Sequence, residues 1–255
     1  MSWSAKQYTA FENERTRPVR DLLSAVPTMT ARRAVDAGCG PGNSTEVLAA
    51  FFPGAEIAGF DSSADMIEAA RKRLPKIKFE IADVGSWRDP GPFDVILANA
   101  VFQWVPDHAR LFPRLIEKLA PGGSLAVQMP DNLNETAHRL MREVAADGPW
   151  AGKLAKVSGA RTPIESAAWY YGLLRPLCAR VEVWRTTYFH SLANAEAIVE
   201  WFKGSGLRPF LAPLDEDERK RYLDRYLALI ADAFPPFRDG SVLLPFPRQF
   251  LVATR

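Results

Sequence analysis

Strand-like and helix-like segments alternate through residues 31–130, and this alternation restricts the possible folds more than any other feature of the chain. Strands that are joined by helices run parallel and lie in one sheet with helices on its faces. We therefore expect a Rossmann-like α/β fold with a mostly parallel sheet and helices on both faces. The expected strands are 31–38, 55–61, 77–83, 93–100 and 122–130, and the expected helices are 43–52, 64–74 and 107–119.

The pattern changes after Pro130. Residues 132–176 are mainly helical in pattern, 180–190 alternate like a strand, and further helices are expected at 193–204 and 215–234 before a last strand. Helical insertions between strands often cover the site at the strand ends. We treat 1–255 as one domain. Its parts are a core over about 31–130, an N-terminal helical lid over 1–30, a substrate-side helical cap with the sixth strand over 131–245, and the last strand over 246–255.

Composition and charge exclude several classes of protein. The chain carries 32 basic and 30 acidic residues, a net charge of +2, with no basic stripe that would favour nucleic acid. No segment reads as a membrane span, and the two cysteines, Cys39 and Cys178, are too few for a disulfide framework or a cysteine-rich zinc site. The three histidines, His108, His138 and His190, show no metal-ligand spacing, and we expect each of them to serve in packing. We expect a cytoplasmic protein without a metal, membrane, nucleic acid or obligate protein partner.

A glycine loop, "VDAGCGPGNST" over 35–45, follows the first expected strand. Its spacing is G-x-G-x-G, and Asn43 stands where the dinucleotide fingerprint G-x-G-x-x-G has its third glycine. Asp36 precedes Gly38 in the loop, and its carboxylate would repel a pyrophosphate but would suit a positively charged cofactor. S-adenosylmethionine carries a sulfonium and an ammonium. We expect Asn43 or Ser44 to cap the helix that follows.

Two further acids stand at the ends of the next two expected strands. Asp61 can accept hydrogen bonds from both hydroxyls of a ribose. Asp83 can accept from the exocyclic amine of adenine, with Val84 or Trp87 offering an apolar face to the ring. Any one of these acids could merely cap a helix. Acids at three consecutive strand ends, with the glycine loop between the first two, favour a cofactor site instead.

These segments resemble the successive signature segments of class I S-adenosylmethionine-dependent methyltransferases: "VDAGCGPGNST", "GFDSS", "IADVGSW" and "ILANAVFQWVPDH". The resemblance implies a seven-stranded sheet whose last strand is antiparallel. Later segments, including "VEVWRTTYFH", "GLRPFL" and "LPFPRQFLVATR", resemble a family of carboxyl methyltransferases within this superfamily, so the similarity covers nearly the whole chain. It implies methyl transfer to a carboxylate of a tricarboxylate substrate. Residues 147–166 match the family least.

A carboxylate acceptor is already ionised at neutral pH, so its methylation requires no general base and we expect no catalytic side chain. The site should instead be rich in donors for carboxylates, among which arginine is the best. The implied fold places Tyr188, Arg208 and Arg248 on the side of the sheet where the parallel strands end. Surface ion pairing remains the alternative for both arginines.

The segment after the fourth strand should meet the methyl-bearing end of the cofactor. We expect Asn99 to contact the methionine portion, and Gln103 and Trp104 to line the acceptor pocket, although Trp104 could equally belong to the core. The resemblance also implies that the N-terminal segment covers the cofactor, with Arg15 on either the cofactor or the substrate. The expected cofactor residues are Tyr8, Arg15, Asp36, Gly38, Gly40, Asn43, Asp61, Ser62, Met66, Asp83, Val84 and Asn99.

Three other functions compete with this reading. A methyltransferase could act on another polycarboxylate, an amine or a quinone precursor, although an acceptor that bears a proton normally requires a base. A nicotinamide-dependent oxidoreductase would bind NAD tightly. A sensor module would bind S-adenosylmethionine without turnover on any carboxylate.

Overall fold

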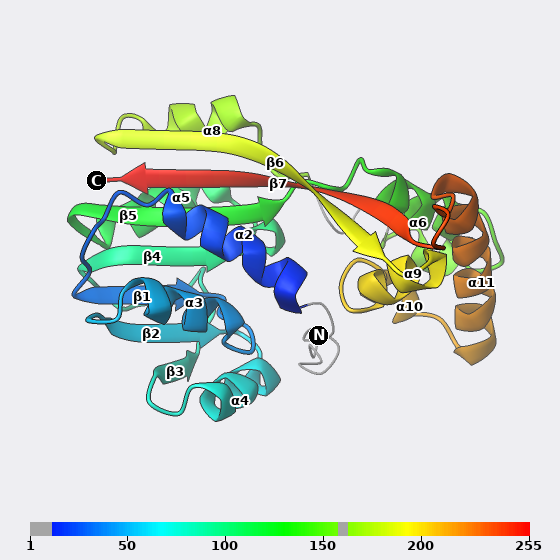
Figure 1. Cartoon of the computed structure of the whole chain (residues 1–255), viewed down its shortest axis with the longest axis horizontal. Coiled ribbons are helices and arrows are strands. Elements are labelled where there is room, and N and C mark those ends of the chain that lie inside the picture. Colours follow the sequence, from blue (N-terminus) through cyan, green and yellow to red (C-terminus); the bar gives the residue numbers. More distant parts are fainter. Residues whose placement is uncertain (1–11, 158–162) are drawn as a thin grey trace. The chain divides into compact units, whose positions relative to one another are not determined.

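The computed structural model of the protein describes residues 12–157 and 163–255. Within these ranges seven strands form one sheet in the order β3-β2-β1-β4-β5-β7-β6 (Figure 1). The pairs β1–β2, β1–β4, β2–β3 and β4–β5 are parallel, and β7 runs against its neighbours. The α/β fold with an antiparallel last strand is confirmed. The strands are β1 (Arg33–Ala37), β2 (Glu56–Asp61), β3 (Lys78–Ile81), β4 (Phe93–Asn99), β5 (Leu119–Pro130), β6 (Arg180–Leu192) and β7 (Val242–Thr254).

The helices expected at 43–52, 64–74, 107–119, 193–204 and 215–234 are present, with small differences at their ends, whereas the short helices at 102–104 and 208–211 were not predicted. Pro18 lies inside the first described helix, which belongs to the N-terminal segment 1–30 that the sequence predicts to be helical. The helices are α2 (Glu12–Ser24), α3 (Asn43–Phe51), α4 (Ala64–Arg73), η1 (Phe102–Trp104), α5 (His108–Glu117), α6 (Thr136–Ala146), α7 (Ala151–Leu154), α8 (Ala167–Leu174), α9 (Ala195–Lys203), α10 (Arg208–Leu211) and α11 (Glu216–Ala233).

The chain divides into two compact units. Unit 1 consists of Met1–Pro130, Ile164–Thr186 and Gln249–Arg255, and unit 2 consists of Asp131–Pro163 and Thr187–Arg248. Both units contain part of β6 and part of β7, because the boundaries fall inside these strands. The description of the chain as a single domain, with the internal boundaries given above, stays a prediction.

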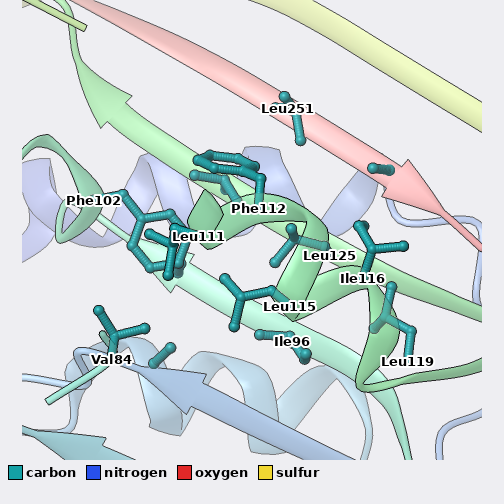
Figure 2. Packing of buried hydrophobic residues seen from close by; sticks show 14 of the residues in the cluster. Val84, Ile96, Phe102, Leu111, Phe112, Leu115, Ile116, Leu119, Leu125 and Leu251 are labelled. Carbon is teal, nitrogen blue, oxygen red and sulfur yellow. The ribbon is translucent and has the colours of Figure 1, made fainter. Parts of the chain in front are cut away.

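The core of unit 1 holds the strands that carry the glycine loop. Apolar side chains spaced three and four residues apart give α5 a single buried face. Figure 2 shows this face against the sheet, and burying each such side chain contributes roughly 1.5–3 kcal/mol. The buried residues are Leu111, Phe112, Leu115 and Ile116 of α5, Ile96 of β4, Leu125 of β5 and Leu251 of β7.

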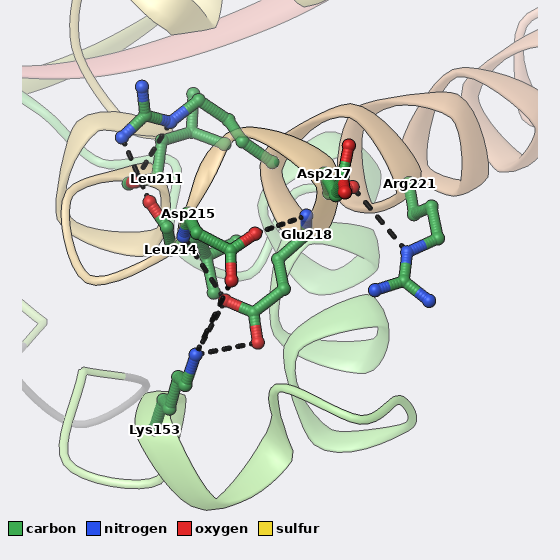
Figure 3. Close-up of polar contacts among 8 residues, drawn as sticks. Lys153, Leu211, Leu214, Asp215, Asp217, Glu218 and Arg221 are labelled. Atoms are coloured by element: carbon green, nitrogen blue, oxygen red, sulfur yellow. Dashed lines mark hydrogen bonds and ion pairs between the residues drawn. The ribbon is translucent and has the colours of Figure 1, made fainter.

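In unit 2, α11 begins with a capping box. The Asp215 carboxylate accepts from the Glu218 backbone N–H, and the Glu218 carboxylate accepts from the Asp215 N–H. Lys153 of α7 donates to both carboxylate oxygens of Glu218, at 2.6 and 2.7 Å (Figure 3). Because the Glu218 side chain is nearly buried, this ion pair stabilises the fold more than an exposed pair would. It holds α7 at the start of α11.

Within the described ranges, no helix is long and apolar enough to cross a membrane. In the same residues, no group of three or more His, Cys, Asp or Glu side chains is placed to hold a metal ion. The expected cytoplasmic location and the expected absence of a metal stay predictions.

Candidate functional site

The glycine loop after β1 is tightly packed at its first glycine and open at its second. The N–H of Gly38 donates to the carbonyl of Phe60, at the end of β2, over 2.8 Å. A Cβ added to Gly38, whose φ is +75°, would lie 2.3 Å from Cγ2 of Val101. Gly40 also has a positive φ, +53°, but a Cβ there would meet no atom of the described residues within 4 Å. Gly38 therefore serves packing, whereas Gly40 borders open space that a ligand can enter.

Alanine at these two glycines should affect different properties of the protein. Gly38→Ala should destabilise the protein by roughly 2–4 kcal/mol, because strain and overpacking add. Gly40→Ala should cost only about 1–2 kcal/mol from strain, yet lower the affinity for the cofactor. Thermal unfolding and calorimetric titration with S-adenosylhomocysteine measure the two effects. Equal stability losses in both variants, with unchanged cofactor affinity for Gly40→Ala, would contradict this division.

Asp36 lies inside the core, fully buried, at the end of β1. Its Oδ2 accepts from the hydroxyls of Ser44 and Thr45, both at 2.7 Å, whereas Oδ1 has no donor among the described residues. Burial raises the pKa of Asp36 to about 6. A buried carboxylate oxygen without a donor is costly unless a ligand supplies one, and a cation suits it best.

The prediction that Asn43 or Ser44 caps α3 is wrong. The N-cap is Gly42, which has a φ of +91° and no side-chain cap. The Ser44 hydroxyl donates to Asp36 and does not cap the helix. With Gly42 as the N-cap, α3 starts one residue earlier than it would with a cap at Asn43. The sequence analysis also missed Thr45 as a partner of Asp36. The signal for it was the pair of hydroxyl residues, Ser44 and Thr45, directly after the glycine loop.

Asp61 connects the glycine loop to the start of α4. Its Oδ2 accepts from the Gly40 N–H at 3.0 Å, and its Oδ1 accepts from the Ser63 N–H at 2.9 Å. A carboxylate has about four acceptor positions, so the group can still accept from a ribose diol. Burial raises the pKa of Asp61. Nearby, Ser62 is exposed and Met66 is buried.

Asp83 lies just beyond β3 rather than within it. Its Oδ1 accepts from the N–H of Gly85 at 2.8 Å, and the carboxylate is exposed. Trp87 stacks on Phe60 with ring centroids 4.6 Å apart and belongs to the core. Val84 belongs to the same core cluster and is equally buried, so burial does not decide which of the two side chains contacts an adenine.

Asn99 ends β4 and is followed by a turn with an unusual backbone. Ala100 has a φ of +55°, and its N–H donates to the carbonyl of Gln128 at 2.8 Å. Gln103 Nε2 donates to the Ala100 carbonyl at 2.6 Å, which fixes the side-chain amide. The Oδ1 of Asn99 and the Oε1 of Gln103 are buried, and neither accepts from any described residue. Trp104 is 41% exposed, so it is not a core residue.

The unpaired acceptors lie on neighbouring strands. β1 pairs with both β2 and β4, with Asp36 opposite Gly59 and Leu97, so these strands end at the same edge of the sheet. Asp36 and Asn99 therefore present acceptors, and one negative charge, beside the glycine loop. Such a site suits a ligand that donates hydrogen bonds and carries positive charge.

Two of the residues predicted to bind the acceptor, Tyr188 and Arg248, lie in one cluster of unit 2. The cluster also contains the rings of His190, Trp201 and Phe246. The Arg248 guanidinium lies 4.7 Å above the centre of the Phe246 ring and is only 4% exposed. His190 stacks on Trp201 at 4.7 Å, and its ring is parallel to that of Tyr188 at 6.4 Å. Sequence reasoning treated His190 as a packing residue and missed Trp201 and Phe246.

The remaining predicted residues are placed as follows. Arg208 is half-buried and begins α10 in unit 2. Asn43 is buried as the first residue of α3, and its Nδ2 has no acceptor among the described residues. Tyr8 lies outside the described residues. Arg15 lies on α2, whose backbone is described, but its side chain is outside the described part.

The strand order, the antiparallel β7 and the acid-lined glycine loop define the class I methyltransferase fold. Solved structures with this fold include Haemonchus contortus phosphoethanolamine N-methyltransferase 2 in complex with S-adenosylhomocysteine, at a TM-score of 0.56 and 18% identity over 94% of this chain and 52% of that one. The Bacillus subtilis protein YcgJ matches at a TM-score of 0.62 and 11% identity, over 94% of this chain and 98% of that one. A family model described as "Methyltransferase domain" matches residues 10–210.

Curated relatives are far closer in sequence. Trans-aconitate 2-methyltransferase of Rhodopseudomonas palustris strain BisB5 is 55% identical over 253 residues, 99% of both chains. The enzymes of that name from Methylobacterium nodulans and Rhizobium meliloti are 55% and 53% identical, over 98% or more of both chains in each pair. The chain belongs to the trans-aconitate 2-methyltransferase family. The resemblance to class I methyltransferases is thereby confirmed.

Proposed function

We propose that this protein transfers the methyl group of S-adenosylmethionine to a carboxylate of trans-aconitate, forming a monomethyl ester and S-adenosylhomocysteine. The observation that carries the proposal is the identity of 53–55% with trans-aconitate 2-methyltransferases over essentially the whole length of both chains. The identity includes unit 2, where the buried Arg248 offers a site for a carboxylate.

The residues of unit 1 fit S-adenosylmethionine, which supplies an electrophilic methyl group when bound. Asp61 would accept from the ribose hydroxyls, and Asp83 with Val84 would border the adenine. The Oδ1 atoms of Asp36 and Asn99, buried and without a donor among the described residues, would accept from the ammonium. The open backbone at Gly40 lets the cofactor approach. Tyr8, Arg15, Gly38, Asn43, Ser62 and Met66 are the further proposed contacts.

Asp36 should make cofactor binding depend on pH. Burial raises its pKa in the free protein to about 6, and the cofactor's positive charge favours the ionised carboxylate and so lowers that pKa on binding. Binding below pH 6 must then release a proton, and affinity should fall by up to about tenfold per pH unit. Calorimetric titration with S-adenosylmethionine from pH 8 to pH 5 measures this.

Asp36→Asn is the control for this prediction. The variant should bind S-adenosylmethionine more weakly at pH 8, with a smaller change in affinity between pH 8 and pH 5. The same shift has a second consequence in the free protein. Because the native state holds the extra proton, its free energy of unfolding should decrease as pH rises from 3.8 to about 6. A wild-type affinity that is constant down to pH 5 would contradict the assigned role.

Methylation of a carboxylate is governed by position. The acceptor is ionised at neutral pH, so the protein's task is to orient it and exclude water, which contributes up to about 7–11 kcal/mol in favourable cases. Arg248 binds an acceptor carboxylate in bidentate fashion, and Tyr188 and Arg208 are the further proposed contacts. Gln103 and Trp104 contact the acceptor from the turn after β4.

Methyl transfer from labelled S-adenosylmethionine tests the proposal, with trans-aconitate, cis-aconitate and citrate as parallel acceptors and mass spectrometry of the products. We expect a monomethyl ester of trans-aconitate in equal amount to S-adenosylhomocysteine, and little product from the other two acids. Methyl transfer to a different acceptor would show that the proposed substrate is wrong and the proposed reaction class is right. Tight NAD binding without binding of S-adenosylhomocysteine would overturn both.

A further inference from the structure

His108, the first residue of α5, joins three elements of unit 1 through its two ring nitrogens. Nε2 lies 2.9 Å from the carbonyl of Phe102 in η1, and Nδ1 lies 2.6 Å from the hydroxyl of Tyr170 in α8. Tyr170 is completely buried, and its hydroxyl lies 3.4 Å from the N–H of Glu165. The imidazole is therefore held at both edges of the ring.

The direction of these hydrogen bonds follows from the chemistry of the partners. A carbonyl can only accept, so His108 Nε2 carries a proton and donates to Phe102. The Tyr170 oxygen accepts from the Glu165 N–H and donates its own proton to Nδ1. The donors thus run from Glu165 through Tyr170 and His108 to Phe102, an arrangement that corresponds to an imidazole with its proton on Nε2.

Ring packing reinforces the same contact. The ring of Phe112 lies 5.3 Å from that of His108, 5.2 Å from Tyr170 and 5.5 Å from Phe102, measured between centroids. Phe102 is completely buried. Phe112 therefore packs against both the His108 imidazole and Phe102, whose carbonyl the imidazole contacts.

The segment held in this way is short. η1 contains only Phe102, Gln103 and Trp104, and the amide of Gln103 is already bonded to Ala100. Fixing the Phe102 carbonyl therefore limits the movement of the next two side chains. These are the two residues of unit 1 proposed above to contact the acceptor, and Gln103 Oε1 is a buried acceptor without a donor among the described residues.

We propose that His108 and Tyr170 are positioning residues for methyl transfer: their hydrogen-bonded pair sets the orientation of Gln103 and Trp104 toward the acceptor. The inference rests on the proposed function of those two side chains. In this role neither His108 nor Tyr170 needs to touch the reacting atoms. Small displacements of positioning groups can lower the rate strongly, by about 100-fold for a shift of 1 Å.

Tyr170→Phe tests this pair by removing one oxygen and leaving the ring. We expect kcat to fall about tenfold while the dissociation constant of S-adenosylhomocysteine stays within about twofold. His108→Ala should lower kcat further. His108→Gln, whose amide can still donate to the Phe102 carbonyl, should recover part of that loss. Parallel losses of kcat and cofactor affinity in Tyr170→Phe would indicate a merely structural role and overturn the proposal.

Tyr226→Phe is the matched control. Tyr226 is buried in unit 2 and donates to the carbonyl of Ala137 at 3.1 Å, so its loss also removes one buried hydrogen bond. Both variants should lose similar thermal stability, but only Tyr170→Phe should lose kcat. A loss of kcat in Tyr226→Phe that equals the loss in Tyr170→Phe would contradict a specific role for the pair.

A spectroscopic readout separates this proposal from the identity of the substrate. Nitrogen NMR of the His108 ring should show the Nε2–H tautomer, and the side-chain amide signal of Gln103 should shift in Tyr170→Phe but not in Tyr226→Phe. If wild-type protein methylates another acceptor, the kinetic comparison is made with that acceptor. An Nδ1–H tautomer, or an unchanged Gln103 signal in Tyr170→Phe, would overturn the proposal whatever the substrate.

Discussion

Arg248→Gln should raise the KM for trans-aconitate about 100-fold and leave the dissociation constant of S-adenosylhomocysteine almost unchanged. The guanidinium is 4% exposed and lies over the ring of Phe246, so it acts on a carboxylate without competition from bulk water. Glutamine keeps a donor but loses the charge and the two parallel N–H groups. Steady-state kinetics with trans-aconitate measures the effect directly.

Two variants make this result specific. Arg248→Lys keeps the charge but lacks the planar fork, so it should recover only part of the affinity for the acceptor. Arg238→Gln removes an exposed arginine from the connection between α11 and β7 and should leave KM unchanged. If Arg248→Gln lowers thermal stability but leaves the KM for trans-aconitate unchanged, Arg248 serves packing and does not bind the acceptor.

Asp61→Ala should weaken cofactor binding by about 100-fold, the second of the large effects. The substitution removes the acceptor of the Gly40 and Ser63 N–H groups and, by our proposal, the acceptor of both ribose hydroxyls. Losing several charge-assisted hydrogen bonds, each worth about 1.5–3 kcal/mol, is sufficient for this loss. Calorimetric titration with S-adenosylhomocysteine measures it.

Asp94→Ala is the matched control for Asp61. Asp94 Oδ2 accepts from the N–H groups of Arg32 and Arg33, at 2.8 and 3.0 Å, so its loss also leaves two backbone donors without their carboxylate. It lies at the beginnings of β1 and β4, opposite to the edge where Asp61 ends β2. We expect Asp94→Ala to lower stability without changing cofactor affinity. Equal losses of affinity in both variants would refute a direct role for Asp61.

The sequence was sufficient for the fold because its signals are local. Alternating strand and helix patterns predict parallel strands, and parallel strands place the residues after them at one edge of the sheet. The sequence alone therefore predicts that Asp36, Asp61 and Asn99 belong to one site. The antiparallel last strand came from the family resemblance and not from periodicity.

The details of the site depended on contacts that no local pattern encodes. Asp36 bonds to Ser44 and Thr45 because α3 folds back over the end of β1, and that arrangement also gives the cap position to Gly42. The pairing of His108 with Tyr170 joins residues far apart in the chain. Such contacts follow from tertiary packing, so sequence reasoning treated His108 as an ordinary packing residue.

A crystal structure with S-adenosylhomocysteine and trans-aconitate bound would test the central claim most directly. We expect the ribose hydroxyls on the Asp61 carboxylate, the ammonium within hydrogen-bond reach of Asp36 Oδ1 or Asn99 Oδ1, and an acceptor carboxylate on the guanidinium of Arg248. A cofactor bound away from the glycine loop, or a trans-aconitate whose carboxylates are held without Arg248, would contradict the proposed site.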